Sequence, residues 1–272
     1  MFIPVILYFV IFCYVPMYGV IISFQDYYPR LGITGSEWVG FKHFEKLFTG
    51  RYFFPVLRNT LIISIGKLLF GFPAPIILCL LLNEVRSLKF KKVVQTISYL
   101  PHFISWVVLA SIVQTILSPS SGVVNYIIQL LGGEPIFFMG SSDWFRKVIV
   151  GSSIWRDTGW QTVVFMAAIL SIDPQLYEAA DLDGAGRFQK MIYVTLPCIA
   201  PTIIIMFIMA TGNVIQDDFD QIYNMLNAKV MDVGDVIGTY TYRMGIEKMN
   251  FSYVTAVGLF KNVVSLILVT FT

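Results

Sequence analysis

The sequence predicts an all-α integral membrane protein with six transmembrane helices. Of its 272 residues, 56% are hydrophobic and only 13% are charged, and the mean hydropathy is +0.72. About a quarter of the residues of an ordinary soluble domain are charged, so this chain is unusually apolar. Six apolar runs reach the roughly 17 to 25 residues that a helix needs to cross hydrocarbon. The predicted spans are 2–24, 59–82, 93–117, 148–172, 198–214 and 252–272.

The first two spans contain residues that need an explanation. Span 2–24 lacks a cationic start and a small-residue cleavage site, so a signal peptide is the weaker interpretation. Pro4 and Pro16 are expected to kink it. In span 59–82, Lys67 costs about 2.5 to 3.5 kcal/mol in hydrocarbon and should therefore face water or protein. It either lines a pathway or anchors the helix bundle.

Polar side chains also interrupt the third, fourth and fifth spans. In the third, Gln114 shares a face with serine and threonine residues, and this face either lines a pathway or packs against other helices. In the fourth, Trp160 and Gln161 suit sugar recognition, because an indole can cover the apolar face of a pyranose. Asn213 lies at the end of the fifth span. We therefore take Lys67, Gln114, Trp160, Gln161 and Asn213 as candidate pathway residues.

The polar segments between the spans predict an orientation. If 83–92 and 171–197 are cytoplasmic, they hold six Lys or Arg among 37 residues, against nine among 98 in the presumed outer segments. The difference has the direction of the positive-inside rule but is small. Both termini then lie inside, and we expect further cytoplasmic residues before Met1 and after Thr272. The presumed outer segments are 25–55, 118–147 and 215–251, with a short interfacial helix at 122–131.

A cluster of acidic residues in the last outer segment raises the question of a metal site. Asp217, Asp218 and Asp220 lack the glycine and the terminal glutamate of a calcium loop, so a solvated acidic surface is favoured. The role of these three residues is left open. The cysteines and histidines show no spacing typical of metal ligands either, and we expect no metal.

The stretch from Tyr177 to Pro197 is a polar island between two apolar runs. Asp173 can cap a helix whose first position is Pro174, and this helix should run to about Asp183. Gly184 tolerates the left-handed backbone needed at the helix end. A second short helix is expected from 187 to 195, so the stretch should form an elbow of two short helices.

The spacing in this stretch carries a family resemblance. Glu178-Ala179-Ala180, then Gly184 after three residues and Leu196-Pro197 after eleven more, resembles the EAA loop of permease subunits of binding-protein-dependent ABC importers. Asp183-Gly184-Ala185 is similar to the DGA of the sugar-type members. Val194 stands where that family usually has isoleucine, and His43 where an outer signature usually has asparagine.

The resemblance covers nearly the whole chain and implies a function. It implies one permease domain over 1–272, with the six-helix type I importer fold and a cytoplasmic coupling loop at 173–197. The function implied is import of an oligosaccharide or polysaccharide fragment, as one half of a heterodimeric pore in the cell membrane of a bacterium. The implied coupling residues are Tyr177, Glu178, Ala179, Ala180, Asp183, Gly184, Ala185, Arg187, Leu196 and Pro197.

Partners follow from the same resemblance. It implies a second homologous permease, two ATPase subunits and an extracytoplasmic solute-binding protein. This chain has no Gly-x-x-x-x-Gly-Lys-Ser/Thr loop, so it should bind no cofactor, and ATP and Mg²⁺ should belong to the ATPase. We therefore expect a transport subunit and no enzyme. The alternative is a secondary carrier or an intramembrane enzyme, although no HExxH or Gly-x-Ser-x-Gly motif is present. The sequence does not specify which sugar is carried or which permease contacts it.

Overall fold

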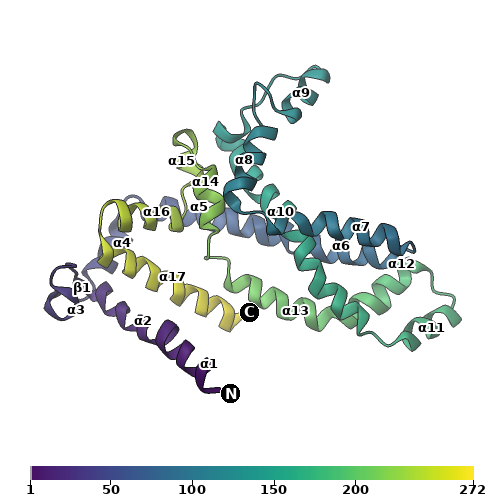
Figure 1. Cartoon of the computed structure of the whole chain (residues 1–272), viewed down its shortest axis with the longest axis horizontal. Coiled ribbons are helices and arrows are strands. Elements are labelled where there is room, and N and C mark those ends of the chain that lie inside the picture. Colours follow the sequence, from purple (N-terminus) through teal and green to yellow (C-terminus); the bar gives the residue numbers. More distant parts are fainter. Residues whose placement is uncertain (1) are drawn as a thin grey trace.

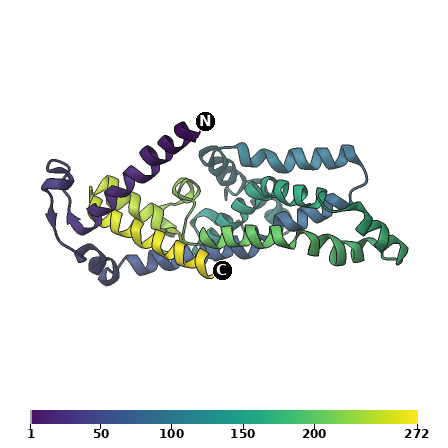
Figure 2. The same cartoon turned by 90° about the horizontal axis from the view of Figure 1, so that it is seen from below.

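The computed structural model describes residues 2–272, which are mostly helical and include one pair of short strands. Figure 1 shows an elongated body from which α8 and α9 project as an arm, with α11 at one end of the long axis. Figure 2 shows that the N-terminal helices also stand apart from the body. The strands β1 (Gln25–Asp26) and β2 (Glu37–Trp38) are antiparallel, with Gln25 opposite Trp38.

The α-helices of the first half are α1 (Phe2–Phe9), α2 (Val15–Met17), α3 (Gly32–Gly35), α4 (Lys42–Thr49), α5 (Phe53–Gly66), α6 (Pro73–Glu84), α7 (Leu88–Tyr99), α8 (Trp106–Ile116) and α9 (Val123–Leu130). Those of the second half are α10 (Ser142–Leu170), α11 (Pro174–Leu182), α12 (Arg187–Lys190), α13 (Leu196–Gly212), α14 (Phe219–Met225), α15 (Met231–Gly234), α16 (Ile237–Tyr242) and α17 (Phe251–Phe271). Short 3₁₀ or π-helical segments are η1 (Val10–Tyr14), η2 (Tyr18–Phe24), η3 (Lys67–Gly71), η4 (Leu100–Phe103), η5 (Phe138–Gly140), η6 (Met191–Thr195), η7 (Ala228–Val230) and η8 (Arg243–Glu247).

Four continuous helices among the described residues are long and apolar enough to cross a membrane. The first coincides with the predicted span 2–24, and the last is shifted by one residue from 252–272. The helix through α5 and α6 extends beyond the predicted 59–82 at both ends, and the one through α12 and α13 begins well before the predicted 198. These four helices are Phe2–Phe24, Phe53–Glu84, Arg187–Gly212 and Phe251–Phe271.

Three prolines inside these helices follow π-helical turns. Pro16, Pro73 and Pro197 each follow a π-helical segment by two residues, after η1, η3 and η6. A proline cannot donate to the carbonyl four residues earlier, and its ring collides with that carbonyl. In all three cases this carbonyl belongs to the π-helical segment, where the wider turn makes room. The helices therefore continue through these three prolines, including Pro197, before which the sequence predicts a helix end.

The segment predicted as the third span has a different course. The helix from Leu88 to Phe103 and the helix from Trp106 to Ile116 meet at an angle of 108°. Between them Ile104 and Ser105 are extended, with ψ of 133° and 149°. The range 93–117 is thus a bent pair of helices. The apolar run from 93 to 117 continues across the break, so its length alone does not reveal the bend.

Packing of α7 against α10 depends on a glycine. Gly159 in α10 is buried, and an added Cβ would collide with the backbone carbonyl of Ser98 in α7. Glycine allows such close approach of helix backbones in membranes.

We expect the Gly159→Ala variant to be less stable by about 1 to 3 kcal/mol, the usual cost of overpacking. The matched control is Gly151→Ala in the same helix, where an added Cβ has no atom within 4 Å. The measurement is the melting temperature of the two purified variants, and equal values would show that the backbone contact is dispensable.

Coupling elbow and central cavity

The start of α11 is formed as its sequence predicts. The Asp173 side chain accepts a hydrogen bond from the Gln175 backbone N–H at 2.9 Å, and Pro174 occupies the first turn. An aspartate in this position satisfies one of the free N–H groups at the helix start. The predicted helix start is confirmed.

The end of α11 is fixed by a glycine. Gly184 has a φ of +75°, which strains any residue with a side chain. The Ala185 N–H donates to the Ala180 carbonyl at 2.9 Å, and the Gly184 N–H to that of Asp181 at 3.1 Å. This pair of bonds defines the Schellman motif, which closes the carbonyl end of a helix. The predicted role of Gly184 at the helix end is confirmed.

The second half of the predicted elbow differs from the expectation. The Gly186 N–H is capped by the Gln189 side chain at 2.7 Å, and a helix then begins at Arg187. It does not stop before Pro197, because the π-helical segment η6 accommodates this proline and the helix continues to Gly212. The prediction of a second short helix at 187–195 is wrong. Instead, the short helix α11 is followed, after the turn at Gly184, by one long helix from Arg187 to Gly212.

Two side-chain contacts hold α11 against this long helix. The Tyr177 hydroxyl lies 2.9 Å from Thr195 Oγ1, and Lys190 Nζ lies 2.6 Å from Asp181 Oδ1. Local spacing does not predict the pair of Asp181 and Lys190, because the two residues meet across the turn at a separation of nine residues. We call α11 and its turn to Arg187 the coupling elbow.

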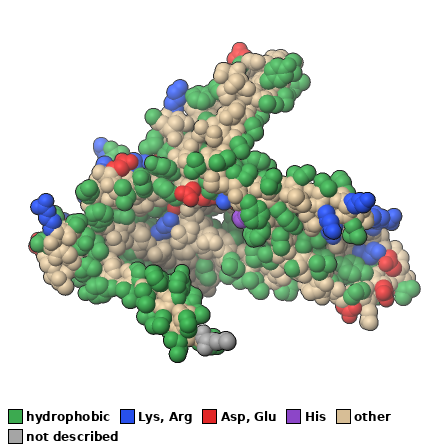
Figure 3. Space-filling view, viewed as in Figure 1, with side chains coloured by type: hydrophobic (Ala, Val, Ile, Leu, Met, Phe, Trp, Pro, Cys, Tyr) green, Lys and Arg blue, Asp and Glu red, His purple; other side chains and the backbone are tan. Residues whose placement is uncertain are grey.

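The face of the coupling elbow that points away from the long helix is exposed. Glu178 and Ala179 are exposed, and Leu182 is 90% exposed. Figure 3 shows acidic side chains gathered at this end of the molecule, next to basic ones over the neighbouring helices. Of the other predicted coupling residues, Asp183, Gly184, Arg187, Leu196 and Pro197 are exposed, whereas Tyr177, Ala180 and Ala185 are partly buried.

Three of the five candidate pathway residues line one cavity. Lys67, Gln161 and Asn213 come from different helices and face a space of about 410 Å³. Sites for small molecules commonly have volumes of about 300 to 1,000 Å³. Asp157, Asp217 and Asp218 line the same space. We call it the central cavity.

The other two candidates lie outside the central cavity. Trp160 stacks on His102, with ring centroids 4.9 Å apart and an interplanar angle of 5°, and Gln114 donates to the Asn224 carbonyl at 3.0 Å. His102 in turn contacts Asp157 at 3.0 Å.

Lys67 lines the cavity and also holds two parts of the chain together. Its Nζ donates to Gln221 Oε1 in α14 at 2.5 Å and lies 3.9 Å from Asp218. Gln221 is fully buried and donates to the Ile149 carbonyl and to Ser152 Oγ. Both interpretations of this lysine, pathway lining and bundle anchor, therefore have a structural basis.

The three aspartates of the outer segment do not form a common surface. The Asp217 side chain is only 2% exposed and pairs with Lys261 at 2.6 Å, while its other oxygen accepts the Gly238 N–H. Asp218 faces the central cavity, and only Asp220 is exposed. The prediction of a solvated acidic surface is wrong for Asp217, because Lys261, far away in the sequence, pairs with it. No group of potential metal ligands occurs among residues 2–272.

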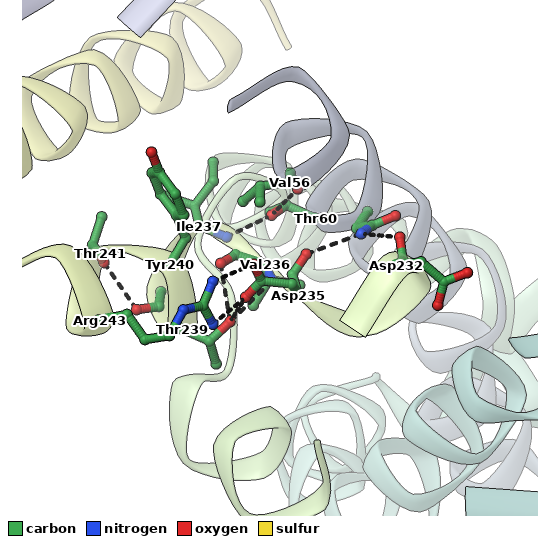
Figure 4. A network of polar contacts seen from close by, with 12 residues as sticks. Val56, Thr60, Asp232, Asp235, Val236, Ile237, Thr239, Tyr240, Thr241 and Arg243 are labelled. Carbon is green, nitrogen blue, oxygen red and sulfur yellow. Dashed lines mark hydrogen bonds and ion pairs between the residues drawn. The ribbon is translucent and has the colours of Figure 1, made fainter. Parts of the chain in front are cut away.

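A polar network fixes the outer segment above the cavity wall (Figure 4). Asp235 is bound by both outer nitrogens of Arg243, at 2.9 and 2.5 Å, and this carboxylate raises the pKa of the Arg243 guanidinium. The Asn59 side chain donates to the carbonyl of Asp235, and the Ile237 N–H donates to Thr60 Oγ1 at 2.9 Å. The network joins the segment around α16 to α5, which carries part of the cavity wall.

Comparison with known proteins tests the resemblance. Residues 71–271 match the family described as "Binding-protein-dependent transport system inner membrane component". Protein LplB of Bacillus subtilis (strain 168) is 50% identical over 98% of this chain and 84% of its own length. The polygalacturonan/rhamnogalacturonan transport system permease protein YteP of the same organism is 48% identical over 99% of this chain and 84% of its own length.

Solved structures agree with these relatives. A chain in the crystal structure of a bacterial ABC transporter involved in the import of the acidic polysaccharide alginate has a TM-score of 0.91. It is 42% identical, and the match covers 98% of this chain and 90% of that one. A structure of the bacterial alginate transporter in complex with an alginate pentasaccharide-bound periplasmic protein matches with the same TM-score, over 99% of this chain and 90% of that one. The predicted family and all-α permease fold are confirmed: the chain belongs to the inner-membrane components of binding-protein-dependent transport systems, and it is an ABC transporter permease.

Proposed function

We propose that this chain is the pore-forming permease subunit of an ATP-driven importer for an oligosaccharide or polysaccharide fragment. The observation that carries the proposal is an exposed coupling elbow at one end of a bundle that also contains a cavity lined by Lys67, Gln161 and Asn213. The names of the relatives, which include permeases for polygalacturonan and for arabinooligosaccharides, support a glycan as the transported solute.

The coupling elbow is the proposed docking element for a separate ATPase. The exposed carboxylate of Glu178 can form a hydrogen bond or an ion pair there, and the methyl group of Ala179 lets a partner surface approach the helix closely. Arg187, Leu196 and Pro197 extend this surface along the long helix. ATP and Mg²⁺ are held by the ATPase, and this chain binds no cofactor.

The remaining partners are a second homologous permease, a second ATPase subunit and an extracytoplasmic solute-binding protein. The apolar helix Phe2–Phe24 supports membrane and permease contacts, because its most apolar window has no residue buried by the rest of the chain. The chain lies in the cell membrane as a multi-pass protein.

The mechanism that we propose is alternating access. Closure of the ATPase dimer on ATP moves the coupling elbow as a rigid body, since its helix ends are fixed by Asp173 and Gly184 and its inner face by Tyr177. The movement changes the access of the central cavity from one side of the membrane to the other. Lys67, Gln161 and Asn213 contact the solute on its way.

The test is to purify the tagged chain from its native membrane under gentle conditions and to identify what is bound. We expect to recover a second permease and an ATPase with the wild-type chain. With the Glu178→Arg variant, we expect the same amount of permease but about tenfold less ATPase. A charge-assisted hydrogen bond of about 1.5 to 3 kcal/mol accounts for a loss of this size.

Glu134→Arg is the matched control, because this glutamate is also exposed but lies in the loop after α9. Recovery of the chain without any ATPase, or equal ATPase recovery with both variants, would contradict the proposed docking role.

A further inference from the structure

Asp218 differs from the other aspartates that line the central cavity. The one side-chain hydrogen-bond donor beside its carboxylate among residues 2–272 is the Trp106 indole N–H, and its ion pair with Lys67 spans 3.9 Å, so most of its acceptor sites are unused. Asp217, by contrast, is bound by Lys261 and the Gly238 N–H, and Asp157 is bound by His102 at 3.0 Å. The Asp218 side chain is 33% exposed. It therefore presents an acceptor with free capacity to the cavity.

Other residues that line the central cavity supply further polar groups that can form additional hydrogen bonds. Asn213 uses its amide N–H₂ on the Met209 carbonyl, which leaves its side-chain oxygen available. Gln161 is exposed and lines the same cavity. The ammonium group of Lys67 has three hydrogens, and one of them is used on Gln221.

An aromatic ring completes the set. Phe72 lines the cavity and is held by an edge-to-face contact with Phe207, at a centroid distance of 5.3 Å. The cavity thus combines one apolar ring with a few polar groups, the combination that fixes the orientation of small ligands. Sugar rings require both, because a pyranose has an apolar face and a rim of hydroxyl groups.

We propose that Asp218 accepts hydrogen bonds from hydroxyl groups of one sugar unit in the central cavity. This inference rests on the proposed function and adds to it a residue that the sequence analysis assigned to a solvated surface. A carboxylate pairs well with hydroxyl donors, since charge-assisted bonds are about twice as strong as neutral ones. Lys67, 3.9 Å from this carboxylate, offsets its negative charge, so the subsite selects for hydroxyl groups and does not by itself exclude an anionic sugar.

The experiment compares Asp218→Asn with Asp220→Asn in the complete transporter. Asp220 is a matched control because it is exposed, lies two residues away and does not line the cavity. Permeases, ATPase and the solute-binding protein are reconstituted in vesicles. The probe is a labelled galacto-oligosaccharide or a labelled alginate oligosaccharide, whichever the wild-type transporter takes up. The measured quantity is the amount of sugar taken up per ATP hydrolysed.

We expect Asp218→Asn to lower uptake per ATP about tenfold, because the sugar released by the binding protein is retained less well in the cavity. Asp218→Glu, which keeps the carboxylate, should restore part of the uptake, and Asp220→Asn should equal the wild type. Equal uptake per ATP in Asp218→Asn and Asp220→Asn would overturn the assignment of Asp218 while leaving the importer function intact. A purified chain that assembles with no ATPase and no second permease would overturn the importer function and the assignment of Asp218 together.

Discussion

Replacing Gly184 by valine should uncouple ATP hydrolysis from uptake. The backbone at this residue has a φ of +75°, and a Cβ added there would have no atom within 4 Å. The effect is therefore conformational and involves no steric clash with other residues. A left-handed conformation costs a residue with a side chain about 1 to 2 kcal/mol, and a β-branched residue more.

The turn after α11 should then relax into another conformation in most molecules. With about 1.4 kcal/mol for each factor of ten, the population of the native turn falls about tenfold or more. Since the coupling elbow is the proposed contact with the ATPase, uptake of sugar per ATP hydrolysed should fall by a similar factor. The measurement is simultaneous uptake and ATP hydrolysis in vesicles that contain the complete transporter.

Gly186→Val is the control for this variant. Gly186 lies in the same turn but has a φ of −70°, and an added Cβ would meet only the Gln189 side chain at 3.6 Å. We expect close to normal coupling. Normal coupling in Gly184→Val as well would show that the turn geometry is not required, and a loss in both variants would point to the side chains themselves.

The coupling elbow was predictable from the sequence because its signals are local. Asp173 caps a group two residues away, and Gly184 closes the helix that ends beside it. The same locality explains the error at Pro197. A proline predicts a helix end, but the neighbouring π-helical segment η6 accommodates it, and nothing in the amino-acid order distinguishes the two outcomes.

The central cavity was only partly predictable, because it is formed by residues far apart in the chain. Lys67 and Gln161 stood out as polar residues in apolar helices, and both line the cavity. Trp160, next to Gln161, points elsewhere, since adjacent residues on a helix are about 100° apart. The prediction that Asp217 is solvated was wrong because its partner Lys261 lies 44 residues away in the sequence.

Replacing Lys261 by methionine should strongly destabilise the protein. The variant leaves the carboxylate of Asp217 buried without its cation, and breaking a buried pair in this way typically costs about 3 to 5 kcal/mol. Asp217 also binds the Gly238 N–H, so the loop between α13 and α14, the start of α16 and α17 all meet at this carboxylate. The measurement is the melting temperature of the purified chain with its partners.

Lys42→Met is the matched control, since Lys42 pairs with Asp26 at 2.5 Å, almost the same distance as the 2.6 Å between Lys261 and Asp217. Lys42 and Asp26 are 59% and 28% exposed, against 16% and 2% for the buried pair. An exposed pair contributes about 1 kcal/mol or less, so this variant should melt close to the wild type. A double variant with Asp217→Asn and Lys261→Met should recover most of the loss, because an asparagine can still accept the Gly238 N–H and no charge is left buried. If Lys261→Met melts like Lys42→Met, the ion pair with Asp217 does not hold these helices together, and the exposure of the two pairs does not determine their contribution.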